Sequence, residues 1–108
     1  MTTTTPINPW YTGQTSPVLD ILLNNDGGPE NITGLIASNF ALSIQSVLGV
    51  DQTGAGTFSI VATNPAEIHY AVNAADVTTK GTYNAFVKAT FPDGVRIYDP
   101  IIWTIIAS

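Results

Sequence analysis

The only histidine of the chain, His69, is the first residue to test for chemistry, because an imidazole can bind a metal ion or carry a proton. The chain has no cysteine, so a transition-metal site would need carboxylates beside this histidine. The spacing offers one such neighbour, Glu67, which shares a strand face with His69 in an extended segment. One carboxylate is too few for a dedicated site, and an exposed strand position is the simpler interpretation.

A calcium site would instead use carboxylates at loop ends, because Ca²⁺ takes oxygen ligands. Asp26, Glu30 and either Asp93 or Asp99 follow turn signals and could gather at loop ends. None of them has the spacing of a dedicated calcium-binding loop. We therefore expect no metal and no other cofactor.

Nucleophilic catalysis has no supporting motif. Ser43, Ser46 and Ser59 fall in expected strands, and no Gly-x-Ser-x-Gly is present. No pair of carboxylates is placed at a fixed separation, and Gly54–Gly56 lacks the helix that a phosphate-binding loop requires. The sequence predicts that the protein is not an enzyme.

Composition narrows the class of partner. The chain has 108 residues, of which 44% are hydrophobic, enough for one folded domain with its own core. Three basic against eight acidic residues give a net charge of −5, which excludes nucleic-acid binding through a basic cluster. No apolar run is long enough to span a membrane, and the N-terminus lacks the pattern of a signal peptide. Charged residues make up only 10%, which fits a Thr/Asn/Ser-coated surface or a surface covered by partners.

Alternating apolar and polar residues predict short strands, and no stretch keeps a helical period. The predicted strands are Pro17–Leu23, Phe40–Leu48, Gly56–Ala62, Glu67–Val72, Tyr83–Phe91, Val95–Tyr98 and, after an interruption at Pro100, Ile101–Ile106. Five of them have one face suited to the core: Leu19, Ile21 and Leu23; Phe40, Leu42 and Ile44; Ile68, Tyr70 and Val72; Tyr83, Ala85, Val87, Ala89 and Phe91; and Ile101, Trp103 and Ile105. Turn signals separate them, as in Asn24–Glu30 and Pro92-Asp93-Gly94. This pattern favours an all-β fold, an immunoglobulin-like β-sandwich of about seven strands.

The segment from Asp76 to Tyr83 (DVTTKGTY) is typical of the tyrosine corner of such sandwiches. Asp76, Gly81 and Tyr83 would form this structural corner, with the Tyr83 hydroxyl bonded to backbone in Ala74–Thr79 and one helical turn before it. Residues 1–15 are rich in threonine and proline and are expected to form an extended N-terminal arm. The sandwich domain would then span residues 16–108.

Three stretches together resemble a known family: Asn24–Gly34 (NNDGGPENITG), the corner Asp76–Tyr83 and Phe91–Gly94 (FPDG). They are similar to the immunoglobulin-like N-terminal domain of siphophage baseplate upper proteins and to related immunoglobulin-like modules of phage virions. Asn31 stands where the family usually has Asp, and the chain ends at Ser108, before the receptor-carrying regions of baseplate upper proteins. The resemblance implies a non-enzymatic structural component of a bacteriophage virion, made in the host cytoplasm. It would decorate a capsid or belong to a tail or baseplate.

The partners implied are other virion proteins, with self-association into a homo-oligomer or symmetric assembly. The expected contact residues are aromatics of the arm and apolar side chains on presumed outer strand faces: Trp10, Tyr11, Val18, Leu22, Phe86, Ile102 and Ile106. The two arm aromatics, Trp10 and Tyr11, could equally pack on their own domain. The alternative is a carbohydrate- or receptor-binding adhesion module, in which Tyr98 with Trp10 or Tyr11 would stack on sugars.

Overall fold

The computed structural model describes residues 2–4, 10–46, 49 and 51–107. In this part of the chain the fold is all-β, as the alternation predicted, and the helical segments are two short 3-10 turns. The strands are β1 (Thr2–Thr4), β2 (Trp10–Tyr11), β3 (Leu19–Asn25), β4 (Gly28–Pro29), β5 (Phe40–Ser46), β6 (Asp51–Thr53), β7 (Thr57–Thr63), β8 (Ala66–Ala71), β9 (Gly81–Phe91), β10 (Gly94–Ile97) and β11 (Ile101–Ile106). The 3-10 turns are η1 (Ala37–Asn39) and η2 (Ala74–Val77).

Seven of these strands have four or more residues, and each overlaps one of the predicted strands. The four short strands β1, β2, β4 and β6 were not predicted. A run of two or three residues is too short to show alternation, so its pairing depends on the neighbouring strand. Val47 and Leu48, at the end of one predicted strand, lie outside the described residues.

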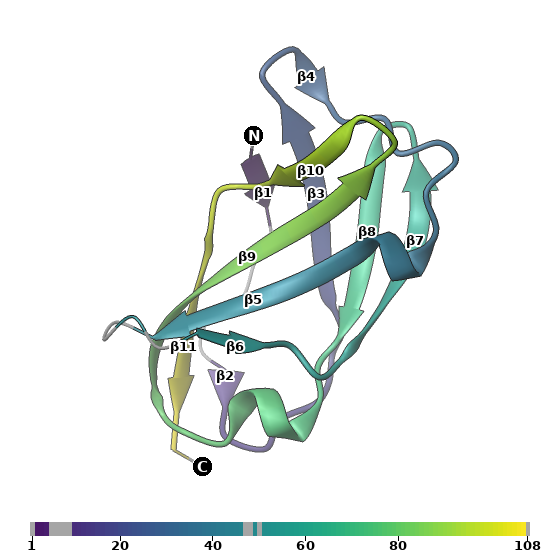
Figure 1. Ribbon diagram of the computed structural model, residues 1–108. Coiled ribbons are helices and arrows are strands. Elements are labelled where there is room, and N and C mark those ends of the chain that lie inside the picture. The colour runs from purple at the N-terminus through teal and green to yellow at the C-terminus, as the bar shows by residue number, and fades with distance from the viewer. Residues whose placement is uncertain (1, 5–9, 47–48, 50, 108) are drawn as a thin grey trace.

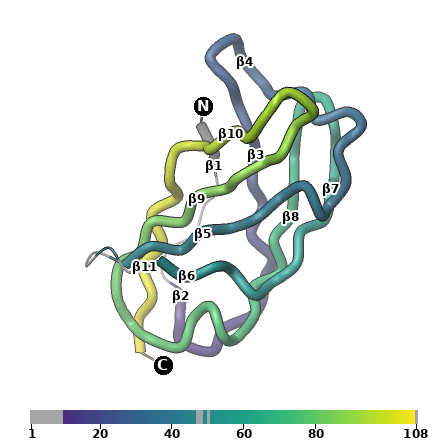
Figure 2. The backbone as a smooth tube through the Cα atoms, in the orientation of Figure 1, coloured from purple at the N-terminus to yellow at the C-terminus, as the bar shows by residue number. Residues whose placement is uncertain are grey.

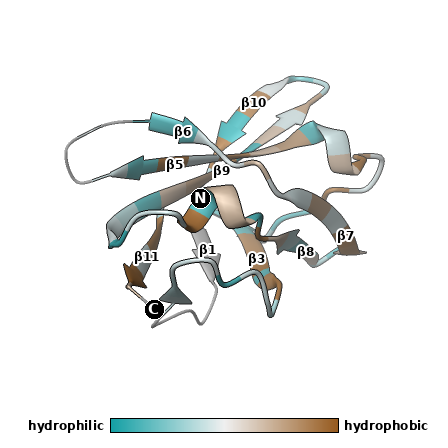
Figure 3. Ribbon diagram, turned by 90° about the horizontal axis from the view of Figure 1, so that it is seen from below, coloured by the Kyte–Doolittle hydropathy of each residue, from teal (hydrophilic) through white to brown (hydrophobic). Residues whose placement is uncertain are grey.

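The strands form two sheets (Figures 1 and 2). One has the order β1-β3-β8-β7 with β4 beside β3, and the other has the order β2-β11-β9-β5-β6 with β10 beside β9. Neighbouring strands are antiparallel except for β2, which runs parallel to β11. Figure 3 shows β5, β9 and β10 in one layer and β3, β8 and β7 in the other. This arrangement is compatible with a β-sandwich.

One core lies between the two sheets, and the predicted inward faces supply it. The buried side chains include Leu19, Ile21 and Leu23 from β3, Phe40, Leu42 and Ile44 from β5, Ile68 and Tyr70 from β8, Ala85, Val87 and Ala89 from β9, and Ile101, Trp103 and Ile105 from β11. The side chains between them in sequence point away from the core, because successive residues of a strand face opposite sides of a sheet. The face assignment of these five strands is therefore confirmed.

The strand formed by β10 and β11 is interrupted at Pro100, as predicted. Ile97 lies opposite Lys88, whereas Ile101 lies opposite Ala85, so four steps along this strand match three steps along β9. The extra residue reverses the alternation, and Tyr98 and Ile101 both point into the core although they are three residues apart.

The predicted arm is corrected by the structure. Within residues 1–15, Thr2–Thr4 pairs with β3 and Trp10–Tyr11 pairs with β11, so the domain does not begin at residue 16. Trp10 is buried, and its ring meets that of Trp103 edge to face with 5.9 Å between centroids. Burial of the Trp10 ring against the core stabilises an ordered position for this segment, although its local sequence is typical of a loop. Met1 and residues 5–9 of the predicted arm lie outside the described residues.

Candidate interaction surface

The outer face of the six-stranded sheet carries a row of apolar side chains along β11 and its neighbours. Ile102 is 61% exposed and lies opposite Asn84 of β9, while Ile106 lies opposite the exposed Tyr11 of β2. Ile97 of β10 is 55% exposed. Phe86 projects from β9 on the same face and is half-buried. We call the set Tyr11, Phe86, Ile97, Ile102 and Ile106 the β11 face.

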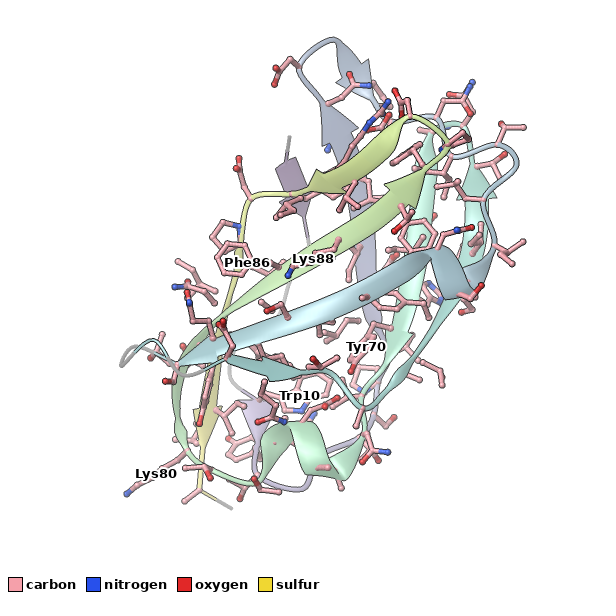
Figure 4. All side chains as sticks on the ribbon, viewed as in Figure 1. Trp10, Tyr70, Lys80, Phe86 and Lys88 are labelled. Carbon is pink, nitrogen blue, oxygen red and sulfur yellow. The ribbon has the colours of Figure 1, made fainter. Side chains whose placement is uncertain are left out.

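The strand register places Phe86 between two isoleucines of the β11 face, while Thr104 separates Ile102 from Ile106 along β11. Phe86 lies between Asn84, which is opposite Ile102, and Lys88, which is opposite Ile97. Figure 4 shows Phe86 beside the chain that connects β10 to β11, with Lys88 further along β9. Diagonal neighbours at this spacing are within reach of aromatic side chains, so Phe86 bridges the two isoleucines.

Val18 and Leu22 are exposed as predicted, but the structure does not bring them to the β11 face. Leu22 is on the outer side of β3, opposite Glu67, and Val18 precedes that strand. Leu22 belongs to the other sheet, whose outer side points in the opposite direction, and Val18 lies just before β3 of that sheet. The seven predicted contact residues are therefore divided between two surfaces and the core.

Trp10 and Tyr98 are buried, so the prediction that Trp10 contacts a partner and the alternative that either residue stacks on a sugar are wrong. Their exposed fractions are 3% and 1%, and each polar atom is bonded inside the protein. Trp10 Nε1 donates to the Gln14 carbonyl at 2.8 Å, and the Tyr98 hydroxyl donates to Glu30 Oε2 at 2.9 Å. Tyr11 is the one exposed aromatic left of the three proposed for sugar stacking.

Glu30 is a buried carboxylate, and it is one of the loop residues that the sequence analysis weighed as calcium ligands and did not favour. Its side chain accepts hydrogen bonds from Tyr98, from Arg96 Nη1 at 2.8 Å and from Asn25 Nδ2 at 3.2 Å. Burial raises the pKa of Glu30, but these hydrogen bonds and the Arg96 charge outweigh it and hold the pKa below its ordinary value.

Arg96 also lies 3.6 Å from Asp93 Oδ2, so one arginine pairs with both Glu30 and Asp93. Its guanidinium is 4.0 Å from the centroid of the Phe91 ring. The clue missed in the sequence was Arg96 itself, the only arginine of the chain.

The hydrogen bond predicted for the Tyr83 hydroxyl is present. The Tyr83 hydroxyl donates to the Thr79 carbonyl at 2.8 Å, inside the segment expected to receive it, and η2 is the helical turn before it. Gly81 has a φ of 150°, and a Cβ there would lie 3.5 Å from the Tyr83 ring. Gly81 therefore provides a backbone conformation that other residues rarely adopt.

Asp76 is buried and serves a different tyrosine. Its carboxylate accepts from the Tyr70 hydroxyl at 2.6 Å and from the backbone amides of Ala55 at 2.7 Å and Asn73 at 3.2 Å. Burial and the bond to Asp76 raise the pKa of Tyr70 above its ordinary value. Asp76 therefore links the loop before β7 to the turn before β9, and its role is to stabilise the fold.

A third polar cluster, made of Asp20, Glu67 and His69, lies on the outer side of the five-stranded sheet. His69 Nε2 is 3.5 Å from Asp20 Oδ1 and 3.8 Å from Glu67 Oε2. A hydrogen bond with Asp20, followed by burial and the Asp20 charge, raises the pKa of Glu67, while His69 opposes the rise. The sequence paired Glu67 with His69 but missed Asp20, because only the pairing of β3 with β8 brings it opposite His69.

No protein-family model, curated protein or solved structure matches this chain. Among the described residues, no helix has the length and apolar character needed to cross a membrane. An open hollow of about 300 Å³ is lined by Ala37, Ser38, Phe40, Gly56, Thr57 and Phe58. Its lining has no titratable side chain, so it offers no acid or base for catalysis.

Proposed function

We propose that this protein is a non-enzymatic structural component of a bacteriophage virion, a capsid decoration or a tail or baseplate module that acts through protein–protein contacts. Its fold would be an immunoglobulin-like sandwich. Two observations support the proposal. One is the resemblance to virion modules, carried by Asn24–Gly34, Asp76–Tyr83 and Phe91–Gly94, and the other is the β11 face.

The strand order supports the immunoglobulin-like part of the proposal. The order β1-β3-β8-β7 corresponds to strands A-B-E-D of that fold, and β11-β9-β5 corresponds to G-F-C. In this correspondence β6 takes the place of C′, and Tyr83 lies near the start of strand F, where the corner tyrosine of that fold is found. The hydrogen bond from Tyr83 to Thr79 supports the same correspondence.

The β11 face is the observation that carries the proposal of a protein partner. Tyr11, Ile97, Ile102 and Ile106 are each at least 40% exposed; Tyr11 lies opposite Ile106, and Phe86 lies diagonally between Ile97 and Ile102. No acidic residue belongs to this set, although the chain as a whole carries a charge of −5. Lys88, opposite Ile97, is the charged side chain beside this set on β9, and an apolar surface bordered by one lysine fits an apolar surface on a neighbouring virion subunit.

Particle binding by matched variants tests the proposal. Ile102→Asp places a charge in the centre of the β11 face, and Val61→Asp makes a similar change at a 50% exposed valine of β7 in the other sheet. Both variants should keep the wild-type unfolding midpoint, because both side chains are exposed. We expect Ile102→Asp to weaken binding to particles assembled without this protein by about tenfold or more, and Val61→Asp to leave it unchanged.

Three results would contradict the proposal. One is wild-type binding by Ile102→Asp, which would exclude the β11 face. Another is a wild-type protein that stays monomeric and does not bind such particles at all. Binding that is instead lost equally in both variants would exclude the β11 face as the specific contact.

A further inference from the structure

The alternation of β3 and β8 places three metal-binding side chains together on the outer side of the five-stranded sheet. Leu19 and Ile21 point into the core, so Asp20 between them points outward, and Ile68 likewise leaves Glu67 and His69 outward. Asp20 and His69 are directly opposite each other across the two strands. Two neighbouring strands of one sheet therefore hold the three side chains, and no loop is involved.

The distances between the potential ligand atoms are close to those of a zinc site. With Zn–N and Zn–O bonds of about 2.0–2.2 Å, two ligand atoms of a tetrahedral site lie about 3.3–3.6 Å apart. His69 Nε2 is 3.5 Å from Asp20 Oδ1 and 3.8 Å from Glu67 Oε2, and the three ligand atoms all lie within 4.8 Å of one another. Small rotations of the side chains would close the remaining gap.

The ligand types select the class of ion. Ca²⁺ and Mg²⁺ prefer sites made only of oxygen, whereas an imidazole nitrogen with carboxylates suits Zn²⁺ and similar transition metals. Two ionised carboxylates and a neutral imidazole carry a charge of −2, which a divalent cation balances. Among the described basic side chains, Arg96 is paired with Glu30 and Asp93, and Lys88 lies on β9 in the other sheet. In Figure 4 Lys80 points away from the fold at the corner before β9.

We propose that Asp20, Glu67 and His69 form a surface site for one Zn²⁺ ion. Three protein ligands leave the fourth tetrahedral position to water. The side chains are 52%, 29% and 33% exposed, so the ion enters directly from solvent.

The chain offers an unambiguous test, because His69 is its only histidine and it has no cysteine. Titration of the full-length protein with ZnCl₂ near neutral pH, followed by calorimetry and by the imidazole NMR signals, should saturate at one ion per chain. Co²⁺ in place of Zn²⁺ should give the visible absorption of a tetrahedral site. A large excess of MgCl₂ or CaCl₂ should not displace either ion.

Variants distinguish this site from general attraction to an acidic protein. We expect His69→Gln and Asp20→Asn each to raise the Kd for Zn²⁺ by about tenfold or more, since each removes one of three ligands. Asp51→Asn is the matched control, because it removes one charge from an exposed position on β6 of the other sheet and should leave the Kd within about twofold. Failure to saturate at one ion, an unchanged Kd in His69→Gln, or an equal loss in Asp20→Asn and Asp51→Asn would each overturn the site.

Discussion

Replacing Tyr70 with phenylalanine removes one oxygen atom from a buried polar cluster, the Tyr70–Asp76 contact. Tyr70 has no exposed surface, and its hydroxyl both donates to Asp76 Oδ2 at 2.6 Å and accepts from the Gly56 amide at 2.8 Å. Phenylalanine fills the same space, so the variant leaves the packing of the ring unchanged. The loss of stability then measures the two hydrogen bonds.

The structure sets the expected size of this loss. A hydrogen bond to a charged group contributes about 1.5–3 kcal/mol, and leaving a buried amide without an acceptor costs about 1–3 kcal/mol. Because the Gly56 amide is only partly buried, we take the lower part of that range and expect about 3 kcal/mol in total. For a domain of this size the melting temperature would fall by about 15 °C.

Tyr83→Phe is the matched control for this change. It also removes one hydroxyl, but from an exposed hydrogen bond to the Thr79 carbonyl, and should cost about 1 kcal/mol or less. Urea unfolding followed by tryptophan fluorescence would give both free energies. If Tyr70→Phe cost no more than Tyr83→Phe, the Tyr70–Asp76 contact would not be a main support of the fold.

Two further predictions concern stability. Gly56→Ala should lower the free energy of unfolding by about 2 kcal/mol or more in the same urea assay, because a Cβ there would collide with the Ala71 carbonyl oxygen and the Tyr70 hydroxyl. Gly27→Ala is the control: a Cβ there makes only an ordinary contact, so its free energy of unfolding should be nearly unchanged. Burial raises the pKa of Glu30, but its hydrogen bonds outweigh burial and hold the pKa in the folded protein below 4.5. The ionised carboxylate therefore stabilises the fold above pH 4.5, and this stabilisation is lost as the pH falls through the folded-state pKa. The unfolding midpoint measured against pH should therefore fall on acidification, and Glu30→Gln should reduce that fall; an unchanged slope would contradict the assignment.

Much of the fold could be predicted because alternation is a local property of the backbone. The inward faces of β3, β5, β8, β9 and β11 follow from side chains that point to opposite sides of an extended chain. The bond from Tyr83 to its own upstream loop was predictable for the same reason, since it joins residues only four apart.

The candidate sites were less predictable because they join distant parts of the chain. Glu30 is hydrogen-bonded to Arg96 and Tyr98, which are 66 and 68 residues away in the sequence. The local sequence around Glu30 does not indicate which distant segment it will contact. Tyr98 also faces inward only because the extra residue near Pro100 reverses the alternation. For Trp10 the sequence left two surfaces open, its own domain and a partner, because a two-residue strand has no period that would decide between them.

The sequence by itself determined that His69 and Glu67 share an outer strand face and that Asp20 faces outward from another strand. Only the tertiary structure decided that these two strands are neighbours, in a register that sets Asp20 opposite His69. The physical reason is that many strand orders satisfy the same alternation. The order adopted depends on how all the strands together bury one core, which no single segment encodes.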